Sequence, residues 1–113
     1  MPHCIVEYST SIEQNVDVNL VIESVHAKAQ ASGLFNPTSI KTRAIPIAHY
    51  HLGSGNNGFV HVALKILAGR TAEQKQALSQ AVLEGLASCF TQGVDLSVEV
   101  IDMDTPSYAK QVL

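Results

Sequence analysis

Apolar and polar residues alternate along three stretches of this chain, and along two others the apolar residues recur every three or four positions. Alternation is typical of a strand that buries one face, and the longer spacing is typical of a helix that buries one side. The alternating stretches are residues 3–8, 59–68 and 96–100, and the helical spacing covers residues 18–29 and 78–90. The pattern therefore predicts strands and helices in alternation.

The first helix is expected to start at a capping box, because Ser11 and Gln14 have the spacing in which each side chain bonds the other's backbone amide. Gly33 ends the run of apolar residues that follows. The run consists of Val18, Ile22, Val25 and Ala29. A helix of about five turns is predicted.

An extended segment, residues 39–51, follows this helix and contains Pro46. Proline cannot donate a ladder hydrogen bond, so two short pieces are expected in place of one strand. Residues 53–58 are expected to form an exposed turn, whose last two residues, Asn57 and Gly58, favour positive backbone dihedrals.

The second half of the chain repeats this pattern. The strand at 59–68 carries its apolar face on Val60, Val62, Leu64 and Ile66. A second capping box, Thr71 to Gln74, opens a helix that is expected to stop near Gly93. The apolar stripe of this helix is Leu78, Val82, Leu86 and Phe90, and the last strand alternates Leu96, Val98 and Val100.

Each half is thus a βαβ unit, and the two units have similar sequences where their helices start. Ser-Thr-Ser-Ile-Glu-Gln follows the first strand, and Gly-Arg-Thr-Ala-Glu-Gln follows the later one. Because βαβ crossovers are right-handed, the units, at about 2–52 and 58–103, can join into one mixed four-stranded sheet with both helices on one face. We expect an α+β fold in a single domain, 1–113, with the opposite sheet face free for self-assembly.

Composition narrows the classes of partner. The 113 residues are 46% hydrophobic, and a formal charge of -3 with seven Lys and Arg argues against nucleic-acid or anionic-membrane partners. No apolar run reaches the roughly 20 residues that span a bilayer, and no signal peptide is recognisable, so we expect a soluble, cytoplasmic protein. Cys4 and Cys89 are expected to be buried free thiols. The tail from Asp102 is expected to be a loose arm, ordered only against a neighbouring subunit.

Pro2 is the first candidate for chemistry. Initiator methionine is commonly removed before a small second residue, which would leave proline as a free secondary amine. Most chains that begin Met-Pro do so by chance, but here a strand begins at His3 and would hold the nitrogen at the edge of a sheet. Burial and a nearby positive charge both lower the pKa of an amine, so Pro2 would act as a neutral base near pH 7.

Arg70, Lys41 and Arg43 are the candidate binding residues. Arg70 follows Gly69 and precedes the second helix, so a carboxylate there would meet a guanidinium and a helix amino terminus together. Lys41 and Arg43 are two residues apart in the extended segment and point to the same side of a strand. The three cations indicate a small anionic substrate, although solvated charges at a strand edge would give the same pattern.

Two blocks of sequence carry a family resemblance. The opening Met-Pro-His-X-Ile-Val-Glu and the later Phe-Val-His-Val-Ala-Leu-Lys-Ile-Leu-Ala-Gly-Arg, which ends at Arg70, resemble the 5-carboxymethyl-2-hydroxymuconate isomerase family of the tautomerase superfamily. The resemblance implies two βαβ units assembled as trimers or hexamers, and a cofactor-free isomerase of aromatic catabolism that uses no metal. Pro2 would move a proton from the 2-hydroxyl of a dienol to a carbon, which gives the 2-oxo isomer, and Arg70, Lys41 and Arg43 would bind the substrate.

Some positions depart from the family. Lys41 stands where the relatives usually carry arginine, which replaces a bidentate contact by a point charge. The segment 47–52 also lacks the tryptophans of the relatives, so a pocket of different shape is expected. Two alternatives therefore stand: a tautomerase-superfamily enzyme with another substrate, such as a dehalogenase or hydratase, and a non-catalytic oligomeric binding protein.

Other features are assigned structural roles. The Gly-X-Gly-X-X-Gly run at 53–58 spells a dinucleotide fingerprint but precedes a strand instead of a helix. His49 and His51 share a strand face, yet without a nearby Cys, Asp or Glu they fall short of a zinc site and are expected at the surface or a pocket rim. His61 is flanked by apolar residues and is expected to be an interface or core residue.

Overall fold

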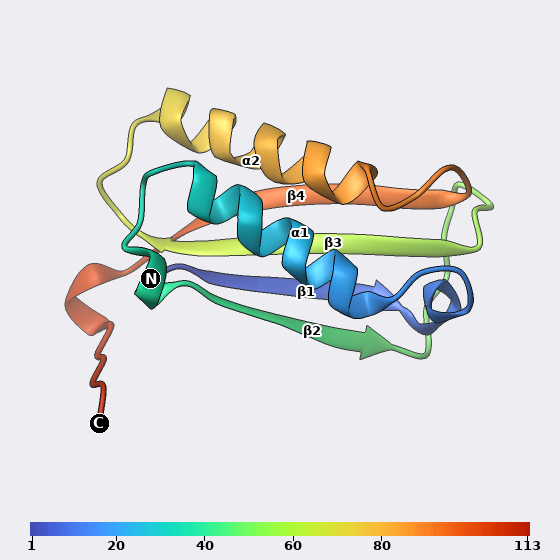
Figure 1. Ribbon diagram of the computed structural model, residues 1–113, viewed down its shortest axis with the longest axis horizontal. Helices are drawn as coiled ribbons and strands as arrows, with labels where there is room; N and C mark the ends of the chain where they lie inside the picture. The colour runs from blue at the N-terminus through green and yellow to red at the C-terminus, as the bar shows by residue number, and fades with distance from the viewer.

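A computed structural model describes the whole chain, residues 1–113. Two helices lie against one four-stranded sheet (Figure 1). The strands are β1 (His3–Ser9), β2 (Lys41–Ile47), β3 (Gly58–Leu67) and β4 (Val94–Met103), and the helices are α1 (Val18–Ala31) and α2 (Ala72–Ala87). Three short 3-10 helices are η1 (Thr10–Gln14), η2 (Pro37–Ser39) and η3 (Thr105–Ser107).

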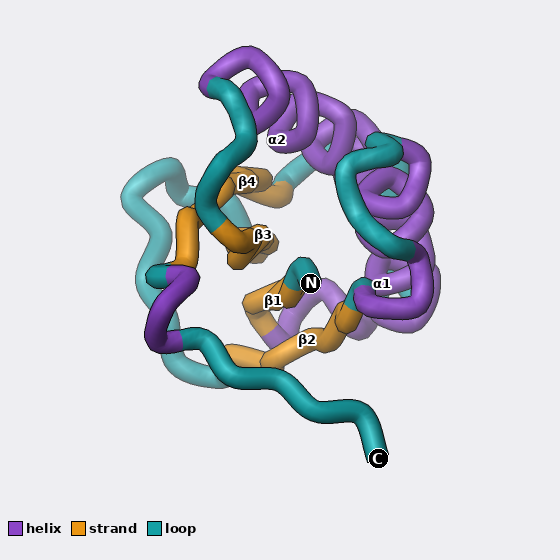
Figure 2. The backbone as a smooth tube through the Cα atoms, turned by 90° about the vertical axis from the view of Figure 1, so that its left-hand side faces the viewer, coloured by secondary structure: helices purple, strands orange, loops and turns teal.

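The sheet has the strand order β2-β1-β3-β4. β1 and β2 are parallel, β3 and β4 are parallel, and the two pairs meet as antiparallel neighbours at β1 and β3. The predicted α+β fold, with one mixed sheet and both helices on one face, is confirmed (Figure 2). His3 pairs with Lys41 on one side and with Lys65 on the other, so the start of β1 lies beside the start of β2 and the end of β3.

The core lies between the sheet and the helices, where every second residue of β1 and β3 is buried. Its fully buried members are Cys4, Val6, Val21, Val25, Ala29, Val60, Val62, Leu64, Ile66, Leu78, Val82 and Leu86. The residues between them on the central strands point away from the helices and are half-buried. We call this side the open sheet face, and its central residues are Ile5, Glu7, His61, Ala63 and Lys65.

The predicted start of the first helix is wrong. Ser11 and Gln14 lie in η1, and no side chain caps that turn. α1 begins later, at Val18, where the Asp17 carboxylate accepts the N–H of Asn19 at 2.9 Å. The buried stripe of this 14-residue helix is Val21, Val25 and Ala29, and Ile22 is only half-buried.

The middle of the chain forms one strand and not the two pieces that were expected. β2 runs through Pro46, which the sheet tolerates because β2 is an edge strand. The loop at 53–57 is exposed and precedes a strand, as expected. Its positive φ is at Gly55, and neither Asn57 nor Gly58 has one, contrary to the prediction.

The second capping box is confirmed. Thr71 Oγ1 accepts the N–H of Gln74 at 3.1 Å, and Gln74 Oε1 accepts the N–H of Thr71 at 2.9 Å. α2 ends at Ala87, earlier than the predicted end near Gly93. Phe90 therefore packs against the core from the turn after the helix and not from the helix itself.

The tail is not the loose arm that was expected from Asp102 onward. β4 includes Asp102 and extends to Met103, and η3 then turns the chain back across the end of the sheet where β1 starts (Figure 2). The Tyr108 hydroxyl lies 3.0 Å from His3 Nε2, and the two rings meet edge to face with centroids 6.0 Å apart. The tail is thus ordered against its own chain.

Candidate functional site

The amino end of the chain lies between the sheet and α1 (Figure 2). Pro2 is fully buried, and its carbonyl accepts the N–H of Lys41 at 3.0 Å, which joins the starts of β1 and β2. The Met1 amine donates to the carbonyl of Ser39, at the end of η2, at 3.0 Å. Since Met1 acylates the Pro2 nitrogen, the free amine at this place is that of Met1.

Positive charge surrounds this amine. Burial lowers the pKa of the Met1 amine below its ordinary value, and the charges of Lys110, Lys41 and Arg70 lower it further. Lys110 Nζ lies 3.1 Å from Ser39 Oγ, and Lys41 Nζ lies 3.4 Å from the Ser39 carbonyl. The ion pairs of the chain involve none of these three cations. The surroundings therefore favour a neutral amine.

Arg70 lies between β3 and α2, and other groups hold its guanidinium in place. Arg70 Nη2 donates to the carbonyl of Leu34 at 2.6 Å, and the guanidinium carbon lies 5.3 Å from the centre of the Phe35 ring. Gly69, with a φ of +123°, permits the turn that precedes it. These contacts orient the side chain and leave further N–H groups of its fork for an anion.

Arg43 lies on the same side of β2 as Lys41, as predicted, but it contacts His3. Arg43 Nη1 lies 3.0 Å from His3 Nδ1. A guanidinium only donates, so Nδ1 accepts, and the proton of neutral His3 is on Nε2, which faces the oxygen of Tyr108. Burial, followed by the charges of Arg43 and Lys41, lowers the pKa of His3 and keeps the ring neutral.

The structure thus brings together three of the four residues singled out in the sequence, Pro2, Lys41 and Arg70, and adds two that were missed. We call this group the amino-end cluster: Pro2, Ser39, Lys41, Arg70 and Lys110. Lys110 was missed because it lies in the segment expected to be a loose arm. The one available signal was the scarcity of cations, since each of only seven Lys and Arg needs an explanation.

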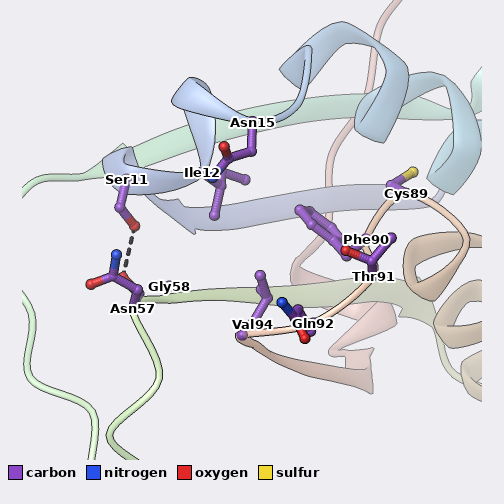
Figure 3. A pocket seen from close by; sticks show the side chains of 11 residues that line it. Ser11, Ile12, Asn15, Asn57, Gly58, Cys89, Phe90, Thr91, Gln92 and Val94 are labelled. Atoms are coloured by element: carbon purple, nitrogen blue, oxygen red, sulfur yellow. Dashed lines mark hydrogen bonds between the residues drawn. The ribbon is translucent and has the colours of Figure 1, made fainter.

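A cavity of about 460 Å³ lies at the other end of the sheet (Figure 3). It is bounded by η1, the start of β3 and the turn after α2, and Ser11 donates to the Asn57 carbonyl at its rim at 2.8 Å. None of its lining residues is charged, so it offers no cation to an anionic ligand. Cys89 lines it and is half-buried, less than expected, whereas Cys4 is fully buried; both are free thiols.

The remaining candidate histidines lie apart from the amino-end cluster. His49 and His51 are exposed in the loop after β2, so they do not share a strand face. His61 lies on the open sheet face, with Nδ1 2.7 Å from Ser97 Oγ and Nε2 2.5 Å from a Glu99 carboxylate oxygen. No three His, Cys, Asp or Glu residues are grouped as metal ligands. Neither helix is long and apolar enough to cross a membrane.

Comparison with known sequences points to an isomerase family. The sequence profile of 5-carboxymethyl-2-hydroxymuconate isomerase matches residues 2–112. The chain is also 30% identical over 92 residues to 5-carboxymethyl-2-hydroxymuconate Delta-isomerase of Escherichia coli. The matched region covers 80% of this chain and 73% of that enzyme.

Solved structures share the fold. A 5-carboxymethyl-2-hydroxymuconate isomerase from Deinococcus radiodurans R1 matches with a TM-score of 0.85 at 24% identity, over 97% of this chain and 88% of that chain. A symmetric trimer described as Q0 fused 4-OT wild type matches with a TM-score of 0.72 at 20% identity, over 89% of this chain and 85% of that chain. The chain therefore belongs to the 5-carboxymethyl-2-hydroxymuconate isomerase family and is an isomerase of the tautomerase superfamily.

Proposed function

We propose that this chain, once Met1 is removed, is a cofactor-free keto–enol isomerase in which the Pro2 nitrogen transfers the proton. The observation that carries the proposal is the cationic surrounding of the buried amino end, which lowers the pKa of an amine placed there. A base must be neutral to accept a proton near pH 7, and these neighbours favour the neutral form. We take 5-carboxymethyl-2-hydroxymuconate as the substrate, because its negative charge complements the site.

The proposed reaction needs one base and a stabilised anion. The Pro2 nitrogen removes the proton of the 2-hydroxyl, the electron pair moves along the conjugated chain, and the protonated amine delivers a proton to the carbon at the far end. The product is the 2-oxo isomer, and Pro2 is neutral again. Arg70 binds a carboxylate and stabilises the dienolate, and Lys41 binds a second carboxylate as a point charge. Arg43, in contact with His3, supports the same edge of the site.

Replacing Pro2 with alanine tests the base. Alanine is also a small second residue that permits Met1 removal, but it supplies a primary amine that is not held in a ring. We expect kcat to fall at least roughly tenfold in an ultraviolet assay of dienol consumption. Pro46→Ala, in the exposed part of β2, is the matched control and is expected to keep its activity. Intact mass establishes processing, and unchanged turnover in a processed Pro2→Ala protein would exclude the proline base.

Lys41 motivates a second candidate, a tautomerase with a different substrate. A lysine makes a single charged contact where an arginine would make a bidentate one, so a site built on it discriminates less among carboxylates. A panel of 2-hydroxydienoates that differ in their carboxylates, followed by ultraviolet absorbance, separates the two candidates by kcat/KM. A processed chain that consumes none of them would indicate the non-catalytic binding protein.

We also propose that the chain forms a homotrimer through the open sheet face. This face carries half-buried apolar residues such as Ile5 and Ala63, which a neighbouring copy would cover. The fused 4-OT relative, a symmetric trimer with the same fold, supports this arrangement.

A further inference from the structure

We propose that Lys110 is a third carboxylate-binding residue of the active site, carried there by the tail and positioned by the contact between Tyr108 and His3. The inference rests on the proposed isomerase function and deepens it. It gives the segment after β4, which no other feature of the fold explains, a role in recognising the substrate.

The path of the tail is the first observation. η3 reverses the chain after β4, and the N–H of Tyr108 bonds the carbonyl of Thr105 at 3.3 Å (Figure 2). The Tyr108 side chain then reaches His3 on the open sheet face at the start of β1. Two residues further on, Lys110 Nζ donates to Ser39 Oγ at 3.1 Å. The tail is thus held at two points, His3 and Ser39.

The charges around Ser39 are the second observation. Its carbonyl accepts from the Met1 amine at 3.0 Å and from Lys41 Nζ at 3.4 Å, and its hydroxyl accepts from Lys110. Of these donors, Lys41 and Lys110 remain in the chain without Met1, and they are cations that repel each other. No carboxylate of the chain pairs with either of them. The repulsion is relieved when an anion binds, so the arrangement fits an anionic ligand.

The proposed substrate has as many carboxylates as the site has cationic side chains. 5-Carboxymethyl-2-hydroxymuconate carries three carboxylates, two at the ends of its main chain and one on its side arm. Arg70, Lys41 and Lys110 supply one cation for each. The positive charge of Lys110 also acts on the amine, because it is the first of the charges that lower the pKa of the Met1 amine.

Arg43 gains a role through the same contacts. By donating to His3 Nδ1, Arg43 places the histidine proton on Nε2, opposite the Tyr108 oxygen. We therefore assign Arg43, His3 and Tyr108 as positioning residues that hold the tail, and Lys110 as the residue that touches the substrate.

The test compares Lys110→Met with Lys110→Arg in the processed enzyme, and Lys28→Met on α1 is the matched control. For the tricarboxylate dienol, Lys110→Met is expected to raise KM at least tenfold with little change in kcat. Lys110→Arg keeps the positive charge and is expected to have a KM close to that of the wild type. For a 2-hydroxydienoate with one carboxylate, KM is expected to be unchanged. Tyr108→Phe is expected to raise KM for the tricarboxylate alone, and to add nothing in the Lys110→Met background.

The pH profile is a readout that a merely structural effect would not move. Loss of a nearby positive charge raises the pKa of the Pro2 amine, so the acidic limb of kcat/KM should move to higher pH in Lys110→Met and stay in place in Lys110→Arg. An unchanged limb together with an unchanged KM would overturn the assignment of Lys110.

Binding without turnover separates this inference from the proposed function. Propane-1,2,3-tricarboxylate cannot tautomerise, and calorimetry measures its affinity for each variant. Weaker binding to Lys110→Met supports the third anion contact even if the processed enzyme consumes no dienol. Equal affinity for the wild type and Lys110→Met, in an enzyme whose turnover does depend on Pro2, would reject the Lys110 contact and leave the proline base standing.

Discussion

Five of the seven Lys and Arg residues of this chain lie around the start of β1, namely Lys41, Arg43, Lys65, Arg70 and Lys110. Like charges at short range destabilise a fold unless opposite charges offset them. The chain has ten Asp and Glu residues, yet its two ion pairs, His61 with Glu99 and Lys75 with Asp102, use other cations or a histidine. Binding of an anion explains this distribution better than folding stability does.

The lowered pKa of His3 predicts how stability depends on pH. A histidine whose pKa is lower in the folded state stabilises the fold fully above its unfolded pKa of about 6.5, and this contribution is lost as the pH falls below that value. Denaturant unfolding of the wild type should therefore show stability falling as the pH is lowered below about 6.5. His3→Gln should show a shallower fall over the same range, and parallel curves for the two proteins would contradict the prediction.

For individual residues, the sequence indicated only part of the site. Pro2 and Arg70 were predictable because strand and helix patterns mark the ends at which they lie. Ser39 and Lys110 were not, since their contact joins residues 71 positions apart. No periodicity extends into the tail, and its placement depends on two contacts distant in sequence, Tyr108 with His3 and Lys110 with Ser39.

The two capping-box sequences of the chain behave differently, although their spacing is the same. The box at Thr71 caps α2, whereas the one at Ser11 lies in η1. η1 is held by tertiary packing: Ile12 is buried, and a Cβ at Gly58 would lie 2.9 Å from Ile12 Cγ2. Such contacts override local propensity, and Asp17 takes over the capping of α1.

Thr71→Ala is expected to lower the free energy of unfolding by about 1 kcal/mol, because the Gln74 backbone amide at the start of α2 loses the Thr71 hydroxyl that accepts from it. Denaturant unfolding monitored by circular dichroism measures the change. Thr91→Ala, an exposed threonine outside the helices, is the control and should change stability much less. A loss as large in Thr91→Ala as in Thr71→Ala would show that the cap is not the cause.

On the scale of the whole molecule, the uncovered side of the sheet predicts self-association. Ala63 lies at the centre of the open sheet face and pairs with Ile5 and Glu99 in the neighbouring strands. Ala63→Glu would place a carboxylate beside Glu99 and bury both at a subunit contact, which is costly without a partner charge.

Sedimentation equilibrium should therefore give three times the chain mass for the wild type and a smaller mass for Ala63→Glu. Gln80→Glu, which adds the same charge at an exposed position of α2, is the control and should remain assembled. A wild-type protein that sediments as a single chain would contradict the proposed trimer.

The overall architecture followed from periodicity because each βαβ unit buries its own apolar stripe, and the right-handed crossover leaves few ways to join two such units. The strand order β2-β1-β3-β4 agrees with that expectation. Periodicity does not show what covers the open sheet face. Apolar and charged residues such as Ala63 and Lys65 are mixed on that face, so they form no apolar stripe.

The closeness of the two chain ends has a practical side for anyone who purifies this enzyme. The Met1 amine and Lys110 Nζ both bond to Ser39, so an affinity tag at either end would be attached beside the proposed site. A tag fused before Met1 would keep the Pro2 nitrogen acylated. A tag after Leu113 would extend the tail that the contact between Tyr108 and His3 holds in place. An internal tag in the exposed loop around Gly55, at the opposite end of the sheet, would leave both termini native.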